Sequence, residues 1–134
     1  MYKLNFYQGT SKRFLKLGKN FTMQTIDIKD FNKIELRLGT ILKVEPFDKA
    51  RNPAYKIWVD LGEEIGVKKS SAQVTFHYQP EDLIGRQVLC ACNFPPRQIA
   101  DFMSEILITG FSDEQGNIVL ASVERQVPNG ARLH

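Results

Sequence analysis

The sequence predicts an all-β domain with a few short helices, built around a five-stranded barrel. Several short stretches alternate apolar and polar residues with the period of two that a half-buried strand requires. Clusters of Gly, Pro, Asp and Asn separate these stretches at positions where turns are expected. Gly39 stands inside the first and longest stretch, where a bulge or bend lets a strand curve into a barrel.

The expected elements follow one another along the chain. Residues 27–34 predict a short helix that begins at Asp27, because an acidic residue is favourable at a helix N-terminus. Residues 35–45 predict the first strand, which Pro46 ends. Four more strands are expected at residues 55–61, 67–76, 87–93 and 106–111. A one-turn helix at residues 80–83, which starts with proline, separates the third strand from the fourth. Two final turns are expected at residues 113–117, which lead into an apolar segment at 118–121, and at residues 127–130.

Five strands, a bend in the first and a helical turn between the third and fourth indicate an oligonucleotide/oligosaccharide-binding (OB) barrel with a short N-terminal helix. Ligands of such barrels usually meet the face of strands 2 and 3 and the loops that join strands 1–2 and 4–5. In this chain those loops are residues 47–54 and 94–104. We therefore expect one ligand-binding recess where the two loops and the strand 2–3 face converge.

Cationic and polar side chains gather in these segments. Lys49 and Arg51 lie in the strand 1–2 loop, and Arg97 lies in the connection between strands 4 and 5. The third strand directs alternate residues to opposite faces, so it supplies either Lys68 and Ser70 or Lys69 and Ser71. The full candidate set for binding a peptide or RNA is Lys49, Arg51, Lys56, Lys68, Lys69, Ser70, Ser71, Gln73, Asn93, Arg97, Ser104 and Glu105.

Each class of candidate has a functional and a plain interpretation. The cations either meet phosphates, or acidic and carbonyl groups of a bound chain, or they are solvated charges that keep a loop soluble. Arg97 is the strongest candidate because its guanidinium suits carboxylate and phosphate alike, with a structural salt bridge to Asp101 or Glu105 as the alternative. The serines and Gln73 offer short donors and acceptors to a ligand, or they only complete hydrogen bonds beside the sheet.

The composition is that of one ordinary globular domain, with 134 residues, 43% of them hydrophobic and 25% charged. The formal net charge of +3 is uneven. Residues 1–22 hold five Lys or Arg and no acid, whereas residues 23–134 hold 13 Lys or Arg against 15 Asp or Glu. Any basic binding surface is therefore local, which argues against indiscriminate nucleic-acid binding. No apolar run approaches the ~18 residues of a membrane span, so we expect no membrane insertion.

Residues 1–22 stand apart from the domain at residues 23–134. They lack the roughly 7–15-residue apolar core of a secretory signal. Three interpretations stay open: a flexible basic arm, an organelle-targeting segment, or an upstream start codon assigned in error. Met23 directly precedes the first helical sequence, which favours the assignment error, and we place no function on this extension.

The chain carries no catalytic or cofactor motif. Cys90 and Cys92 stand two apart in a predicted strand, so their side chains share a face and cannot easily bridge each other. No Cys or His partner stands at zinc-ligand spacing, so we expect no metal and two small buried thiols in a reducing, cytoplasmic environment. A nucleophile–base pair, a phosphate-binding loop and paired acids in a useful frame are also missing. We therefore expect a binding protein without a cofactor rather than an enzyme.

Five segments of the chain together resemble one family. They are residues 36–41, 49–56, 69–75, 93–100 and 102–107, which read LRLGTI, KARNPAYK, KSSAQVT, NFPPRQIA and FMSEIL. These segments resemble the CsaA proteins, export-related chaperones that share the tRNA-binding domain of some aminoacyl-tRNA synthetases and their cofactors. The resemblance spans about residues 26–134, and the segments at 49–56 and 70–73 are its most specific parts.

The resemblance implies an OB barrel extended by C-terminal strands that pair two copies into a homodimer with two ligand pockets. We place the dimer interface at the apolar segment Ile118, Val119 and Leu120. The implied ligands are unfolded or precursor polypeptides in protein export, and structured RNA, above all tRNA, is the ligand of the wider domain family. The sequence thus predicts a homodimeric cytoplasmic chaperone of CsaA type, and the alternative is a tRNA-binding protein that uses the same pocket.

Overall fold

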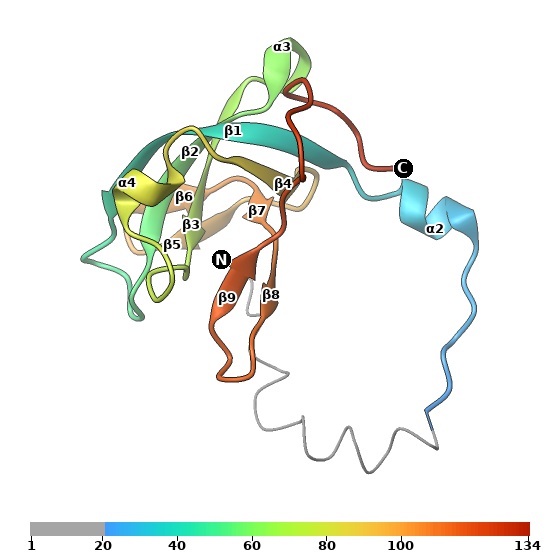
Figure 1. Ribbon diagram of the computed structural model, residues 1–134, viewed down its shortest axis with the longest axis horizontal. Coiled ribbons are helices and arrows are strands. Elements are labelled where there is room, and N and C mark those ends of the chain that lie inside the picture. The colour runs from blue at the N-terminus through green and yellow to red at the C-terminus, as the bar shows by residue number, and fades with distance from the viewer. Residues whose placement is uncertain (1–20) are drawn as a thin grey trace.

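The main sheet of the computed structural model has five antiparallel strands in the order β3-β2-β1-β4-β7 (Figure 1). The structure describes residues 21–134, so the interpretation of residues 1–22 lies almost wholly outside the described residues. The strands are β1 at Leu36–Pro46, β2 at Tyr55–Asp60, β3 at Val67–Ala72, β4 at Gln87–Ala91 and β7 at Leu107–Ile108. The sheet curls into a nearly closed barrel, which confirms the predicted fold class.

Two residues that precede β7 close the barrel at the free edge of β3. Glu105 donates its backbone N–H to the carbonyl oxygen of Lys69 at 2.8 Å, and its Oε1 accepts the Lys69 N–H at 3.1 Å. The hydroxyl of Ser104 accepts the N–H of Ser71 at 3.1 Å. These bonds satisfy backbone groups of β3 that β2 does not reach, so the edge does not stay open for another strand.

Two hairpins complete the β structure. They are β5 at Arg97–Ile99 with β6 at Phe102–Ser104, and β8 at Gly110–Ser112 with β9 at Ile118–Leu120. The predicted connection at residues 94–104 contains the first of these hairpins, which the sequence analysis did not predict. The expected strand at 106–111 is two strands, because the chain changes partners at Thr109. The Thr109 N–H and hydroxyl both donate to the Leu89 carbonyl of β4, whereas its own carbonyl accepts the Ala121 N–H.

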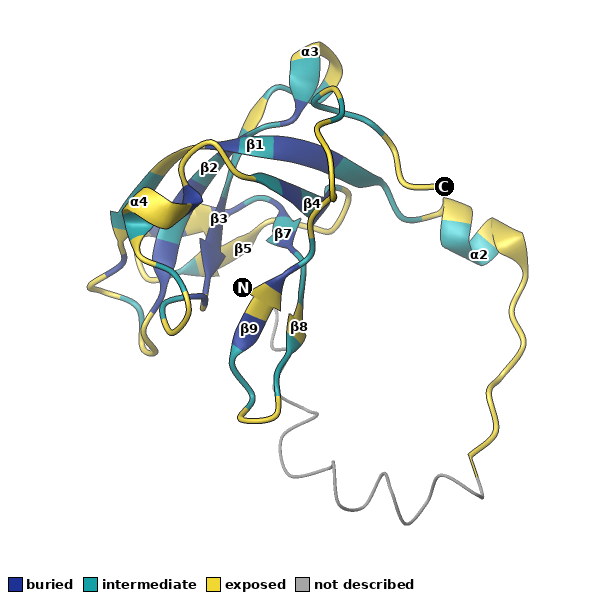
Figure 2. Ribbon diagram, in the orientation of Figure 1, coloured by how far each residue is buried: buried dark blue, intermediate teal, exposed yellow. Residues whose placement is uncertain are grey.

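The described residues include three short helices, α2 at Ile28–Asn32, α3 at Gly62–Ile65 and α4 at Pro80–Leu83. Asp27 caps α2 as predicted: its carboxylate accepts the Lys29 N–H at 3.0 Å, and the Asp30 carboxylate accepts the Asp27 N–H at 3.3 Å. No residue of α2 is buried, and the helix lies outside the barrel (Figure 2). None of the helices in residues 21–134 has the length and apolar character needed to cross a membrane.

The curvature of β1 comes from Leu42 rather than from Gly39. The β1–β2 register shifts between Ile41 and Lys43, so Leu42 is the extra residue of a bulge, and it is exposed. Gly39 instead permits close approach of β1 to the end of β2. A Cβ atom at Gly39 would lie 2.5 Å from Val59 Cγ1 and 2.7 Å from the Asp60 carbonyl oxygen.

The barrel interior is filled by the face of β2 that the sequence predicted. Tyr55, Ile57, Val59 and Leu61 are all buried, in agreement with the alternation of that strand. Cys90 of β4 is fully buried among them as a free thiol, and burial raises its pKa far above the ordinary range. A free Cys90 that packs as a small apolar side chain agrees with the sequence-based interpretation.

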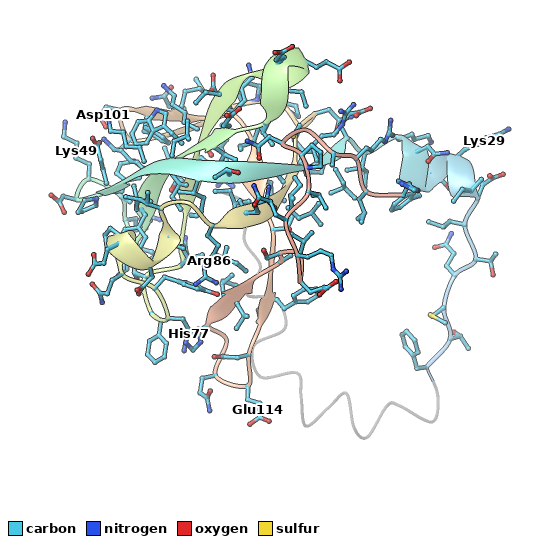
Figure 3. All side chains as sticks on the ribbon, turned by 45° about the horizontal axis from the view of Figure 1, so that its top comes forward. Lys29, Lys49, His77, Arg86, Asp101 and Glu114 are labelled. Carbon is cyan, nitrogen blue, oxygen red and sulfur yellow. The ribbon has the colours of Figure 1, made fainter. Side chains whose placement is uncertain are left out.

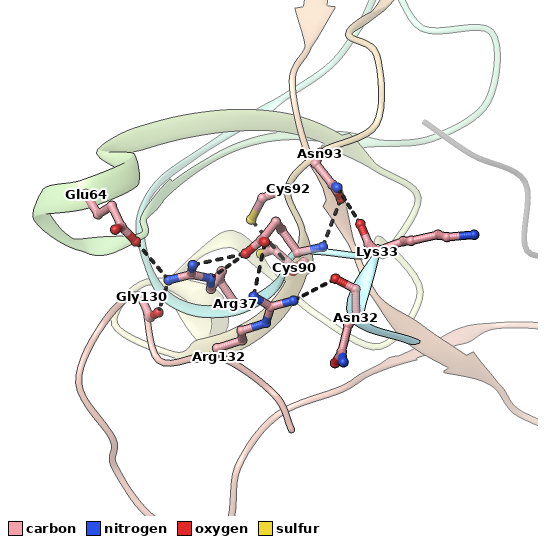
Figure 4. A network of polar contacts seen from close by, with 10 residues as sticks. Asn32, Lys33, Arg37, Glu64, Cys90, Cys92, Asn93, Gly130 and Arg132 are labelled. Carbon is pink, nitrogen blue, oxygen red and sulfur yellow. Dashed lines mark hydrogen bonds and ion pairs between the residues drawn. The ribbon is translucent and has the colours of Figure 1, made fainter. Parts of the chain in front are cut away.

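The C-terminal segment pairs with the N-terminal half of β1 (Figure 4). Leu38 donates its N–H to the Ala131 carbonyl at 2.9 Å, and Leu133 donates its N–H to the Leu36 carbonyl at 2.9 Å. Arg37 adds side-chain bonds to the Gly130 carbonyl, at 2.9 Å, and to the carboxylates of Glu35 and Glu64. The segment therefore takes the place beside β1 that β2 occupies further along the strand.

We expect Gly39→Ala to lower the free energy of unfolding by about 1–3 kcal/mol, because the added methyl group has no room beside Val59. Urea denaturation followed by far-UV circular dichroism measures this loss. Leu42→Ala, in the same strand but exposed, is the matched control and should change the free energy of unfolding by less than about 0.5 kcal/mol. Equal effects of the two substitutions would contradict the assigned close approach.

Candidate ligand-binding face

The outer face of β2 and β3 carries two of the predicted lysines. Lys56 pairs with Ser71 and Trp58 pairs with Lys69 across the two strands, so these four side chains point to the same side. Ile57 and Val59 point to the opposite side, into the core. The register therefore resolves the alternative left by the sequence: Lys69 and Ser71, rather than Lys68 and Ser70, share the face of Lys56.

An aromatic cluster underlies this outer face. Phe102 of β6 contacts Phe47 of the β1–β2 loop, with ring centroids 5.4 Å apart and an interplanar angle of 64°. Phe102 also contacts Trp58 of β2, with centroids 5.9 Å apart and an angle of 78°. Edge-to-face pairs of this kind add about 0.5–1.5 kcal/mol each to the burial of the rings. The cluster thus joins the loop, the sheet and the β5–β6 hairpin around one ring.

Three lysine ammonium groups lie over these rings. Lys43 Nζ is 4.5 Å from the Trp58 ring centre. Lys56 Nζ lies 5.4 Å, and Lys69 Nζ 5.2 Å, from the ring centre of Phe102. Lys43 also pairs with Glu45 at 3.1 Å, whereas in the described part of the chain no carboxylate lies within 4.0 Å of the ammonium group of Lys56 or Lys69. We call Lys43, Lys56 and Lys69 with their rings the cationic face.

An ion pair ties the β1–β2 loop to the β5–β6 hairpin. Lys49 Nζ lies 2.7 Å from Asp101 Oδ2, and Figure 3 shows both side chains at the end of the molecule away from Lys29. The hydrogen bond to Asp101 raises the pKa of Lys49. The same bond lowers the pKa of Asp101, and the charges of Lys49 and Lys56 lower it further. Two of the predicted site segments therefore meet here.

The predicted serines are buried in a connected group. Ser70, Ser71 and Ser104 are all buried. Ser104 bridges them, because its hydroxyl accepts the Ser71 N–H and donates to Ser70 Oγ at 3.4 Å. Burial assigns these hydroxyls to barrel closure in the structure as it stands, and a contact with ligand stays a prediction for all three.

Other predicted residues also make structural bonds. Asn93 donates to the Lys33 carbonyl at 2.7 Å and accepts the Glu35 N–H at 2.9 Å, which ties the connection between α2 and β1 to the segment after β4 (Figure 4). Glu105 closes the edge of β3. Lys68 pairs with Val59 across β2 and β3, so it faces away from the cationic face. These three residues do not join the cationic face.

The remaining candidates lie on exposed segments around the cationic face. Arg51 is exposed in the β1–β2 loop, Arg97 is exposed at the start of β5, and Gln73 is exposed directly after β3. The Lys49–Asp101 pair joins the segments that carry the two arginines. Their contribution to ligand binding stays a prediction.

The predicted dimer segment faces two ways. Ile118 and Leu120 pack in the core of their own chain, so only Val119 of the three residues is exposed, at 42%. Phe111 lies directly opposite Val119 in the hairpin and is 70% exposed. The outer side of β8 and β9 therefore carries an apolar pair that the sequence analysis only half identified, because it took the whole segment as one apolar edge.

The cationic face offers charged and aromatic groups to a ligand. Residues 21–134 contain no group of three or more His, Cys, Asp or Glu side chains placed to hold a metal ion. Lysine ammonium groups held over rings can meet carboxylates, phosphates or carbonyl oxygens of a ligand.

Comparison with known proteins agrees with this architecture. Residues 36–132 match the family described as "Putative tRNA binding domain". The methionine–tRNA ligase of Methanocaldococcus jannaschii is 32% identical over 111 residues, which are 83% of this chain and 17% of the ligase. Methionine–tRNA ligase 1 of Bacillus anthracis is 36% identical over 110 residues, 82% of this chain and 16% of the ligase. The chain therefore spans a small part of the curated relatives that it matches.

Two solved structures are similar over their whole length. Chaperone CsaA from Bacillus anthracis superposes with a TM-score of 0.77 at 42% identity, over 83% of this chain and 100% of that chain. The CsaA chaperone protein from Picrophilus torridus superposes with a TM-score of 0.77 at 38% identity, over 82% of this chain and 100% of that chain. The chain belongs to the tRNA-binding-domain family, with homology to that domain of the methionine–tRNA ligases and with CsaA chaperones as structural neighbours.

Proposed function

We propose that this chain is a cytoplasmic, homodimeric chaperone of CsaA type that binds unfolded or precursor polypeptides in protein export. The observation that carries the proposal is the convergence of the β1–β2 loop, the β2–β3 face and the β5–β6 hairpin around Phe102. This is where OB barrels usually meet their ligands. The match to the entire length of two CsaA chains supports the choice of ligand class.

The face has both kinds of group that an extended polypeptide needs. Lys56 and Lys69 present ammonium groups that can bind carbonyl oxygens and acidic side chains. The connection that supplies Phe102 also exposes apolar surface at Phe94 and Met103. Each such contact is weak, so two faces in one dimer would raise the apparent affinity for a long chain without new contacts.

A tRNA-binding protein that uses the same face is the second candidate, and the family match favours it. The lysines of the cationic face would then neutralise backbone phosphates. If about five cations of this region did so, the affinity for tRNA would fall by roughly two to three orders of magnitude between 50 and 200 mM salt. Polypeptide binding through mixed polar and apolar contacts would depend far less on salt.

We expect the double substitution Lys56→Ala and Lys69→Ala to raise the dissociation constant for a labelled, permanently unfolded polypeptide about fivefold or more, because two charged contacts are lost. Fluorescence anisotropy with the 134-residue chain measures the constant, and circular dichroism checks that the barrel persists. The matched control removes Lys29 and Lys33, which lie on and beside α2, and should leave the constant unchanged.

The same proteins titrated with tRNA at two salt concentrations separate the two candidates. Salt-steep tRNA binding that depends on Lys56 and Lys69, together with no polypeptide binding, would replace the chaperone proposal with the second candidate. If the Lys56/Lys69 and Lys29/Lys33 double variants lost affinity equally, the cationic face would be the binding site in neither candidate function.

The proposed homodimer uses the outer side of the β8–β9 hairpin. We expect Phe111→Ser with Val119→Ser to shift the protein from dimer to monomer at micromolar concentration, because the exposed apolar pair loses its burial against a second copy. Sedimentation velocity measures the change. Ile84→Ser, which alters an equally exposed apolar residue after α4, should leave the dimer intact. A wild-type monomer, or a double variant that stays dimeric, contradicts this interface.

A further inference from the structure

Asp101 directly precedes Phe102, the ring under Lys56 and Lys69 of the cationic face. Its carboxylate pairs with Lys49 at 2.7 Å and lies within the field of Lys56. Both partners of the ion pair are exposed, so water and ions compete for them, and the pair can open at little cost.

The backbone before Asp101 is strained. The β5–β6 hairpin turns through Ala100 and Asp101, between the paired residues Ile99 and Phe102. Ala100 has a φ of 52°, and it is the one non-glycine residue with positive φ in the described part of the chain. This conformation costs an L-residue other than glycine roughly 1 kcal/mol or more and tends to persist where it positions a functional group. Here it sets the direction in which Asp101 leaves the hairpin.

The other acids near the cationic face bind Lys43, bond to a backbone N–H or form no ion pair, and in the described residues none has a carboxylate within 4.0 Å of the ammonium group of Lys56 or Lys69. Glu45 pairs with Lys43 at 3.1 Å. Glu105 uses its carboxylate to accept the Lys69 N–H on the edge of β3. Asp48 is exposed in the β1–β2 loop and forms no ion pair within 4.0 Å in the described structure. Asp101 is therefore the acid that pairs with Lys49 and whose pKa the charges of Lys49 and Lys56 both lower.

We propose that the cationic face selects acidic segments of a polypeptide and that Asp101 is a built-in competitor for their carboxylates. This inference rests on the proposed polypeptide-binding function and names its substrate class. The negative charge of Asp101 repels a ligand carboxylate that approaches Lys56 and Lys69. Asp101 moreover occupies Lys49, so that lysine joins the ligand only when the internal ion pair opens. The competition keeps acidic segments weakly held and quickly released.

Three synthetic peptides with the same apolar residues test the proposal, with Asp, Asn or Lys at the alternating polar positions. The full-length protein should bind the Asp peptide most tightly and the Lys peptide least. Asp101→Asn should tighten binding of the Asp peptide about three- to tenfold at 50 mM salt, since one repelling charge beside the face is removed and Lys49 is released. Most of this gain should vanish at 1 M salt, where the Debye length is about 3 Å.

Asp48→Asn is the matched control, because it removes the same charge from the neighbouring loop but breaks no ion pair. It should change the affinity for the Asp peptide less than about twofold. Lys49→Met completes a double-mutant cycle: its cost for Asp-peptide binding should differ between the wild-type and Asp101→Asn backgrounds. Thermal melting of each variant checks that the hairpin is retained.

Several results would overturn the inference. The inference is wrong if Asp101→Asn leaves the affinity for the Asp peptide unchanged or weakens it. It is also wrong if this substitution tightens the binding of all three peptides equally. If Asp48→Asn raised the affinity for the Asp peptide equally, the effect would come from the change in net charge and not from the position of Asp101. A gain in affinity for tRNA without a gain for the Asp peptide would point to nucleic acid instead.

If the wild-type chain bound none of the peptides or unfolded polypeptides, the proposed function itself would fail. Normal polypeptide binding without acidic preference would reject only this inference.

Discussion

The packing of Phe102 between Phe47 and Trp58 is the interaction on which the rest of the structure depends. Phe102 and Ser104 stand two apart in β6, so they point to the same side, and both are buried while Met103 between them is exposed. The same three-residue strand therefore closes the edge of β3 through Ser104 and assembles the cationic face through Phe102. Barrel stability and the candidate site are coupled, because a change that displaces β6 disturbs both.

Rings, rather than acids, position Lys56 and Lys69 of the face. A lysine that lies over an aromatic ring gains about 0.5–1 kcal/mol at an exposed site and keeps its ammonium group in water. Lys56 and Lys69 converge on one ring from neighbouring strands, which holds two positive charges near each other without an acid between them. Such an arrangement leaves the charges available to a ligand. A conventional ion pair, as Lys49 makes with Asp101, does not.

The sequence predicted the elements whose pattern is local. The strict alternation of Tyr55 to Leu61 gave the correct buried face, and Asp27 gave the correct helix start. The bulge at Leu42 escaped because Leu42 continues the alternation of Leu38, Thr40 and Val44, and a register shift is visible only against the partner strand. The β5–β6 hairpin escaped because its strands have three residues each, which is too short for a clear alternation of apolar and polar residues. The burial of Ser70 and Ser104 could not be predicted from their polarity, because it results from the contact between β3 and β6.

The location of the binding surface is the central claim, and NMR chemical-shift mapping with an unfolded polypeptide tests it most directly. Backbone amide signals of the ¹⁵N-labelled chain would be recorded during titration with the polypeptide. The account predicts that the perturbed amides cluster in the β1–β2 loop, β2, β3 and the β5–β6 hairpin. Perturbations confined to α2, the C-terminal segment or the β8–β9 hairpin would contradict it, because those elements lie outside the group of segments that Phe102 joins.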